Sequence, residues 1–196
     1  MDLNQRIAGQ FMDSARLHAE SAELLAPAIA AAAAMVVEAL LAEKKVLCCG
    51  NGGAALLVQN FAGHMLNRLE LERPGLAAVA LSADSGTITA IADDSDYAMV
   101  FSRQILALGQ PGDVLLAASL GGSSPSVLKA ISAAHERGML VIAMSGGDGG
   151  ALMELLHPAD IHMGVPHESL ARVQELGMLA LHCLCDSVDC ILLGVE

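Results

Sequence analysis

Five short apolar segments, each followed by a polar loop and then by a helical pattern, occupy the chain from Lys44 onward. The apolar segments cover residues 46–49, 77–81, 114–118, 140–144 and, less clearly, 161–165. The helical patterns cover residues 54–69, 97–108, 126–137, 151–156 and 169–192, with a short turn near 87–92. Repetition of strand, loop and helix in this order predicts an α/β fold, in which helices cover both faces of a five-stranded parallel sheet.

Residues 1–43 have a different pattern, which predicts two packed helices. Pro27 separates a first, amphipathic helix from an alanine-rich second one. We find no linker or repeat, so we expect one domain over residues 1–196, with 44–196 forming the α/β core and the C-terminal helix. The N-terminal helices and the last helix carry more apolar surface than one sheet can cover, which favours an oligomer built through residues 1–43.

The composition excludes several classes of function. A net charge of −12 and only 2% aromatic residues leave neither a basic surface for the phosphates of a nucleic acid nor aromatic side chains on which its bases could stack, so direct nucleic-acid binding is excluded.

The longest apolar run, residues 24–37, contains a proline and is too short to span a bilayer. No signal peptide follows Met1 and the five cysteines form no C-x-x-C pair, so we expect a cytoplasmic protein with free thiols.

Glycine-rich loops follow three of the predicted strands, at residues 50–53, 119–124 and 145–150. Ligands of parallel sheets bind beyond the carboxyl ends of the strands, where such loops present backbone N–H groups at helix N-termini. The three loops therefore predict a phosphate site. Gly50-x-Gly52-x-x-Ala55 also fits a dinucleotide fingerprint, but only weakly, because the acidic residue Asp84 lies too far along the chain.

Several motifs resemble those of sugar isomerase (SIS) domain proteins. They include Leu47-Cys48-Cys49-Gly50-Asn51-Gly52-Gly53, Thr89-Ala90-Ile91-Ala92-Asp93-Asp94, Gly112-Asp113-Val114-Leu115-Leu116, Ser119 with Gly122-x-Ser124, and Arg172-Val173-Gln174-Glu175. The chain is similar to the single-domain branch that holds the phosphoheptose isomerases and the DnaA initiator-associating proteins. This resemblance implies a flavodoxin-like three-layer αβα sandwich, a homotetramer and a sugar-phosphate ligand. It assigns the ligand contacts to Asn51, Gly52, Gly53, Ser119, Gly121, Gly122, Ser124 and Asp94.

The resemblance also marks four positions around the reacting end of the sugar. The family pattern has a His and, four residues later, a Glu after the first loop, and a Gln and, eight residues later, a His in the last helix; these groups hold zinc in some members. The corresponding residues here are Asn60, His64, Gln174 and His182. Asn is a poor zinc ligand and no carboxylate remains at these four positions, so we expect no metal or other cofactor. Zinc binding would be expected only if the chain is an active isomerase.

His182, His64 and Gln174 are therefore the catalytic candidates. Histidine titrates near neutral pH and could replace a carboxylate as a base, while the alternative is that both histidines are merely hydrogen-bonded interior groups. If they do chemistry, we expect Asn60, His64, Gln174 and His182 to converge beside the loop at residues 119–124. That loop has also lost a Thr and a Ser hydroxyl relative to the isomerases.

These departures favour a regulator over an enzyme. Our first hypothesis is a homotetramer of the DnaA initiator-associating type, with a degenerate isomerase pocket, that regulates replication by binding DnaA. The alternative is a phosphoheptose isomerase that converts sedoheptulose 7-phosphate to D-glycero-D-manno-heptose 7-phosphate for lipopolysaccharide. A sugar-phosphate sensor without a DnaA contact is a third possibility.

Overall fold

A single parallel sheet of five strands forms the centre of the protein, whose computed structural model describes residues 1–194. The strands are β1 (Val46–Gly50), β2 (Ala78–Ala80), β3 (Val114–Ala118), β4 (Leu140–Gly146) and β5 (Ile161–Val165). Their spatial order is β2-β1-β3-β4-β5. All five predicted strands and their parallel arrangement are confirmed.

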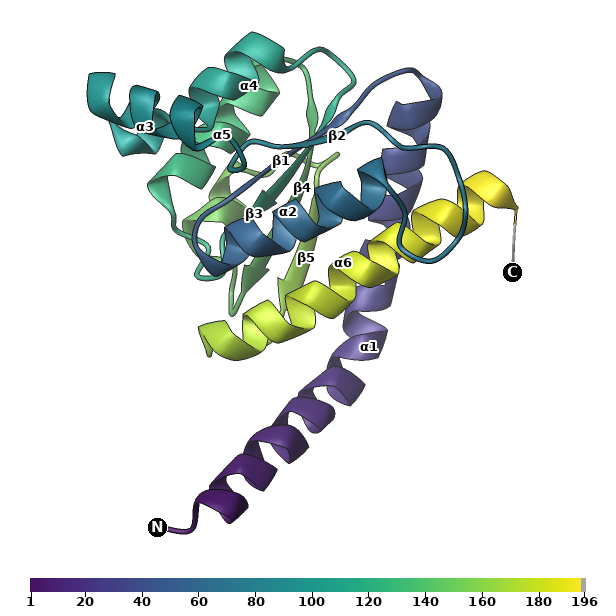
Figure 1. Cartoon of the computed structure of the whole chain (residues 1–196), viewed down its shortest axis with the longest axis vertical. Coiled ribbons are helices and arrows are strands. Elements are labelled where there is room, and N and C mark those ends of the chain that lie inside the picture. The colour runs from purple at the N-terminus through teal and green to yellow at the C-terminus, as the bar shows by residue number, and fades with distance from the viewer. Residues whose placement is uncertain (195–196) are drawn as a thin grey trace.

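Helices cover both faces of this sheet (Figure 1). They are α1 (Leu3–Leu41), α2 (Gly53–Leu66), α3 (Ser85–Asp94), α4 (Ser102–Leu108), α5 (Pro125–Glu136) and α6 (Leu170–Leu193), with 3₁₀ helices η1 (Tyr97–Met99) and η2 (Gly150–Leu155). One hydrophobic core joins the sheet to α1, α2 and α6, and a second joins it to α4, α5 and η2. The predicted three-layer αβα sandwich is therefore confirmed.

Both faces of the central strands are buried, which explains why the strand sequences are continuously apolar. In β1, Val46 and Cys48 belong to the core under α1, α2 and α6, whereas Leu47 and Cys49 belong to the opposite core. The side chains of a strand alternate between the two faces, so a strand covered on both sides carries apolar residues at successive positions.

The predicted N-terminal helix pair is wrong, because residues 3–41 form the single helix α1 with Pro27 inside it. A proline inside a helix lacks one N–H and crowds the preceding turn, which bends the helix without necessarily ending it. Figure 1 shows α1 as one bent helix whose N-terminal part projects away from the sheet. The alanines that follow Pro27 favour helix strongly enough to continue it.

Two helices, α1 and α6, are long and apolar enough to cross a membrane by length and composition alone. Both contribute buried residues to the core described above. Long core helices commonly satisfy this criterion, so it is weak support for a membrane span.

A buried carboxylate closes the amino end of the sheet. Asp113, 1% exposed, precedes β3 and accepts hydrogen bonds from the Gln110 and Lys45 backbone N–H groups and from Lys45 Nζ, at 2.8, 3.1 and 2.6 Å. These contacts fix the entry of β1 and β3 at the edge opposite to the glycine-rich loops.

Replacement of Asp113 by Asn should lower the free energy of unfolding by about 1–3 kcal/mol, because an amide NH₂ would then face donor groups. Urea denaturation measures this change. Asp93→Asn, at an exposed position of α3, is the control and should change stability by less than about 0.5 kcal/mol. Equal effects of the two substitutions would contradict the prediction.

Candidate functional site

The loops after β1 and β3 meet at the carboxyl edge of the sheet. Gly50 pairs with Ala118 at the ends of these neighbouring strands, so the loops that begin at Asn51 and Ser119 start side by side. The sheet grows from β1 to β2 on one side and from β3 to β4 and β5 on the other, so the strand order reverses between β1 and β3. Ligands of open α/β sheets bind at such a switch point. The fold therefore places the first and second glycine-rich loops at the expected ligand position.

A cavity of about 370 Å³ lies between these two loops. Asn51, Gly53 and Ala54 line it on one side, residues 118–121, 123 and 124 line it on the other, and Leu170 of α6 closes one wall. Most of the cavity lining is apolar, with Leu120 and Leu170 among its residues, and Asn51, Ser119, Ser123 and Ser124 supply its polar side chains.

Asn51 organises the polar side of the cavity. Its Nδ2 donates hydrogen bonds to Ser124 Oγ and Ser126 Oγ, both at 2.8 Å, and its Oδ1 accepts one from the Tyr97 hydroxyl at 2.8 Å. The side-chain amide of Asn51 thus links the loop after β1 to the N-terminus of α5. The Ser124 hydroxyl is held through its oxygen, so its hydrogen can be donated to a ligand.

The N-terminus of α5 adds to the anion-binding character of the cavity. Ser124 is the N-cap residue, Pro125 starts the helix, and no side chain makes a capping hydrogen bond there. The Ser124 backbone N–H donates to Ser119 Oγ at 3.3 Å, which brings a second hydroxyl to the same place. The positive end of the helix dipole and the two hydroxyl groups favour a phosphate or another anion here.

Two glycines of these loops are required by close contacts. A Cβ on Gly53 would collide with the side-chain amide of Gln174, which lies directly against the loop. Gly122 has φ +68° and faces the Gly149 carbonyl oxygen so closely that no side chain fits. The first contact joins α6 to the cavity, and the second joins the loop after β3 to the loop after β4.

Two histidines meet between α2 and α6, beyond Gln174. The rings of His64 and His182 lie edge to face, with centroids 5.4 Å apart and an interplanar angle of 75°. His182 Nε2–H donates to Asn60 Oδ1 at 3.2 Å, and His64 Nδ1–H donates to the Arg68 carbonyl oxygen at 3.3 Å. In the neutral forms these bonds leave His182 Nδ1 and His64 Nε2 as unprotonated nitrogens, which can act as bases.

The groups that meet here do not fit a zinc ion. Structural and catalytic zinc sites use histidine, cysteinate and carboxylate ligands, whereas this cluster offers two imidazoles and the amide of Asn60. No carboxylate joins it: within residues 1–194, the only group of three or more histidine, cysteine or acidic side chains at metal-binding distances lies elsewhere. We therefore derive no chemical step through a metal.

The structure brings most of the predicted site residues together. Asn51, Gly53, Ser119, Gly121 and Ser124 line the cavity. Gly52 and Gly122 shape the same two loops through positive φ angles. Asp94 instead lies exposed at the end of α3, outside the residues that line the cavity.

Three of the four predicted catalytic positions meet, but none of these three lines the cavity beside the loop at residues 119–124, where we expected them. Asn60, His64 and His182 form one cluster. Gln174 directs its amide toward Gly53 and so lies between this cluster and the cavity. The reason is the helical rise, which puts Gln174 about 12 Å from His182 along α6.

Tyr97 is a member of the site that the sequence did not reveal. A tyrosine at the start of a helical pattern carries no signal for a contact with Asn51, which lies 46 residues away in the chain. Ser126 was hidden in the same way, because it follows the Ser119–Ser124 motif and resembles an ordinary first-turn residue of a helix.

The other histidine cluster has a structural explanation. His135, His157 and Asp160 lie near the amino end of the sheet, where His135 Nε2 contacts Asp160 Oδ2 at 2.8 Å. Both carboxylate oxygens of Asp160 also accept backbone N–H bonds, from Val141 at 2.9 Å and from His157 at 2.7 Å. The two rings are stacked, so their nitrogen lone pairs cannot point at a common ion.

The cysteines do not supply a thiolate nucleophile to the site. Burial raises the pKa of the Cys185 thiol to about 12, with the Asp189 charge adding to the effect. Burial also raises the pKa values of Cys48, Cys49 and the more exposed Cys183. These thiols stay protonated at neutral pH, which excludes thiolate chemistry at these positions.

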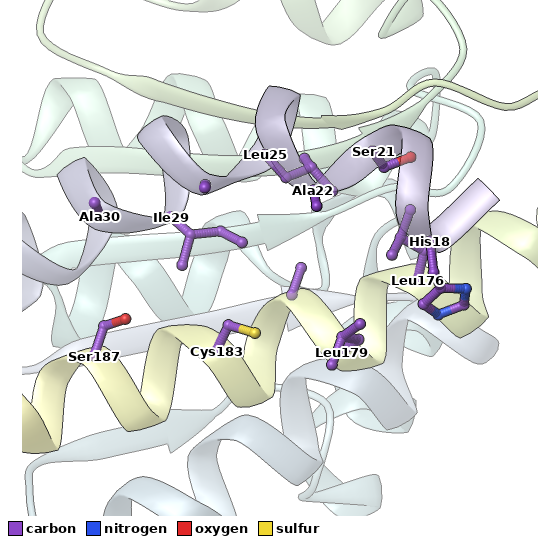
Figure 2. A pocket seen from close by; sticks show the side chains of 12 residues that line it. His18, Ser21, Ala22, Leu25, Ile29, Ala30, Leu176, Leu179, Cys183 and Ser187 are labelled. Carbon is purple, nitrogen blue, oxygen red and sulfur yellow. The ribbon is translucent and has the colours of Figure 1, made fainter. Parts of the chain in front are cut away.

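A second hollow, of about 290 Å³, lies between α1 and α6 (Figure 2). Leu25 and Ile29 of α1 face Leu176 and Leu179 of α6 across it, and Cys183 and Ser187 continue the α6 side. Most of its lining is apolar, with His18 at one end, so it offers a packing surface rather than a site of chemistry.

Comparison with known proteins identifies relatives that share the fold of this chain over nearly its whole length. The model of the SIS domain family matches residues 10–146. A phosphoheptose isomerase from Aromatoleum aromaticum is 54% identical over 196 residues, covering 100% of this chain and 99% of that protein. Among solved structures, phosphoheptose isomerases from Francisella tularensis and Neisseria gonorrhoeae match this chain with TM-scores of 0.93 and 0.91. Each is 41% identical and covers 96% of this chain and 99% of its own.

These similarities overturn the prediction of a DnaA initiator-associating regulator. Four relatives that match over 99–100% of this chain at 50–54% identity are phosphoheptose isomerases, and so are the two solved structures at 41% identity. The prediction gave too much weight to the exchange of two residues, Asn60 and His64. In the structure this exchange leaves an organised histidine pair and not a dismantled pocket.

Replacement of Gly122 by Ala should lower the free energy of unfolding by about 2–4 kcal/mol, since it combines a strained positive φ with a collision against backbone. The matched control is Gly121→Ala. Its Cβ would meet only Leu170 Cδ2 at 4.0 Å, so the cost should be at most about 1 kcal/mol. Urea denaturation compares the two variants, and a Gly122→Ala protein as stable as the control would contradict the assignment.

Proposed function

The chain belongs to the SIS domain family, and on that basis we propose that it is a phosphoheptose isomerase. The substrate would be sedoheptulose 7-phosphate and the product D-glycero-D-manno-heptose 7-phosphate. The full-length similarity to phosphoheptose isomerases supports this proposal. The observation that carries it is the pair of imidazoles, His64 and His182. They meet on two helices, α2 and α6, that also border the cavity between the loops after β1 and β3, which we call the anion cradle.

The spacing between the cradle and the histidines suits this substrate. Leu170 and Gln174, at the start of α6, border the cavity, whereas His182 lies two to three turns further along. A heptose 7-phosphate carries its phosphate and its reacting carbons at opposite ends of the chain. With the phosphate held by the Ser119–Ser124 loop, the C1–C2 end would extend along α2 and α6 toward the histidines.

The reaction moves two protons and needs no oxidant or reductant. One imidazole removes a proton from C1 of the ketose and, as the imidazolium so formed, gives a proton to the C2 oxygen, which yields a 1,2-enediol. The other imidazole then takes the proton of the C1 hydroxyl and gives a proton to C2, which yields the aldose and returns both rings to their neutral forms. His64 Nε2 and His182 Nδ1 are the two nitrogens that we assign to these transfers, because the other nitrogen of each ring is already bonded.

The chain's apolar surface supports the predicted assembly into a homotetramer. Ile7, Phe11 and Met12 of the projecting part of α1 are 55–74% exposed, and the hollow between α1 and α6 is similarly apolar. Surfaces of this kind mark contacts between proteins. We place this assembly, through residues 1–43, and a cytoplasmic location within the same proposal.

Replacement of His182 or His64 by Gln should lower kcat by about 10²–10⁴-fold, because each change removes a base while keeping a similar polar volume. The assay follows aldose formation from sedoheptulose 7-phosphate, with and without EDTA. His157→Gln, at the amino end of the sheet, is the control and should leave kcat unchanged. Absence of turnover by the unsubstituted protein, or full activity of both variants, would sink the proposal.

Replacement of Ser124 by Ala should weaken the binding of inorganic phosphate by roughly tenfold or more, because it removes a donor to the anion and the partner of Asn51. Titration calorimetry with inorganic phosphate measures the dissociation constant. Ser132→Ala on the exposed face of α5 is the matched control. Equal affinities of the two variants would show that the anion binds elsewhere.

A further inference from the structure

A buried ion pair joins the loop after α2 to α6. Arg73 Nε donates to Asp189 Oδ1 at 2.5 Å, and each side chain is only 2% exposed. Removal of two charges from water is costly, and apolar residues often stabilise a protein equally well at such positions. A contribution to stability alone therefore does not account for this ion pair.

The guanidinium of Arg73 also closes the carboxyl end of α2. Its Nη2 donates to the carbonyl oxygen of His64 at 3.0 Å, and its Nη1 donates to the carbonyl oxygens of Met65 and Asn67 at 2.9 and 3.2 Å. Carbonyls in the last turn of a helix have no partner within the helix. A side chain from outside α2 thus holds the backbone of the residue that carries one of the two imidazoles.

Asp189 lies on the same side of α6 as the other imidazole. It follows His182 by seven residues, which is two helical turns. Figure 1 shows α2 and α6 running side by side in the same direction across the sheet. Gln174 against Gly53 connects their first turns, and Arg73 with Asp189 connects the end of α2 to the last turns of α6.

We propose that Arg73 is a positioning residue, which holds α2 and α6 in the one longitudinal register that brings His64 edge to face with His182. Its single planar group contacts Asp189 on one helix and three carbonyls on the other, so sliding either helix would break several of these bonds. Its kinetic consequences rest on the proposed isomerase function, whereas the contact between the two rings does not.

Arg73→Lys is the decisive variant. A lysine ammonium can keep the pair with Asp189 but cannot span that carboxylate and the α2 carbonyls together. We expect kcat to fall roughly 10–100-fold, as for a small misplacement of catalytic groups, while KM changes by less than about twofold. The dissociation constant of inorganic phosphate should stay the same, because the cradle is built by other loops. In NMR spectra, the cross-relaxation between the ring protons of His64 and His182 should be lost.

Asp113→Asn is the matched control, because it alters another buried, cation-paired carboxylate at the opposite end of the sheet. It should lower stability without changing kcat or the ring contact. All variants are measured at a temperature where circular dichroism shows them folded. Asp189→Asn provides a second test if Arg73→Lys does not fold, and it should lower kcat in the same direction.

Three results would overturn the proposal: an Arg73→Lys protein that keeps both kcat and the ring contact, a loss of phosphate binding in parallel with kcat, or an equal loss of kcat in Asp113→Asn. A failure of the isomerase function gives a different result. The unsubstituted protein would then show no turnover, while the NMR contact and the phosphate affinity would still decide whether Arg73 sets the register of the helices.

Discussion

The parallel pairing of β1 with β3 determines where everything else in the site can lie. Because Gly50 and Ala118 end these strands at the same level, the two following loops must share one edge of the sheet. The helix that leaves the first loop, α2, packs on the same face as α6, so the cradle and the histidines are built from neighbouring elements. One pairing in the sheet thus fixes both the anion site and the helix pair that would carry the chemistry.

The first and the later turns of α2 and α6 carry different parts of the candidate site. The first turns border the cavity through Gly53 and Leu170, beside the N-terminus of α5, whose dipole suits an anion. Later turns carry Asn60, His64 and His182, away from that dipole. This separation along the two helices suits the proposed ligand, which is long and charged at one end only.

The sequence predicted the sheet well because its strands are buried on both faces. Short, continuous apolar segments followed by glycine-rich loops are typical of such buried parallel strands. It failed at Pro27, where alanine-rich flanks and the docking of the following turns on the sheet outweigh a helix breaker. In the site, loop residues such as Asn51 and Ser124 were accessible to pattern and resemblance. Tyr97 and Arg73 were not, because their partners lie 46 and 116 residues away and only the fold brings them together.

The two residues that argued most strongly against an enzyme form a consistent set when taken together. An amide at position 60 cannot titrate, but its oxygen accepts the Nε2–H of His182 and so selects the tautomer with a free Nδ1. An imidazole at position 64 then supplies the second group that can exchange protons, held through Nδ1 to the Arg68 carbonyl. A neutral pair of this kind does not need to bury a carboxylate between two apolar helices, a step that carries a large desolvation cost. In the proposed isomerase, Asn60 would therefore set the tautomer of His182, and His64 would supply the second group that exchanges protons.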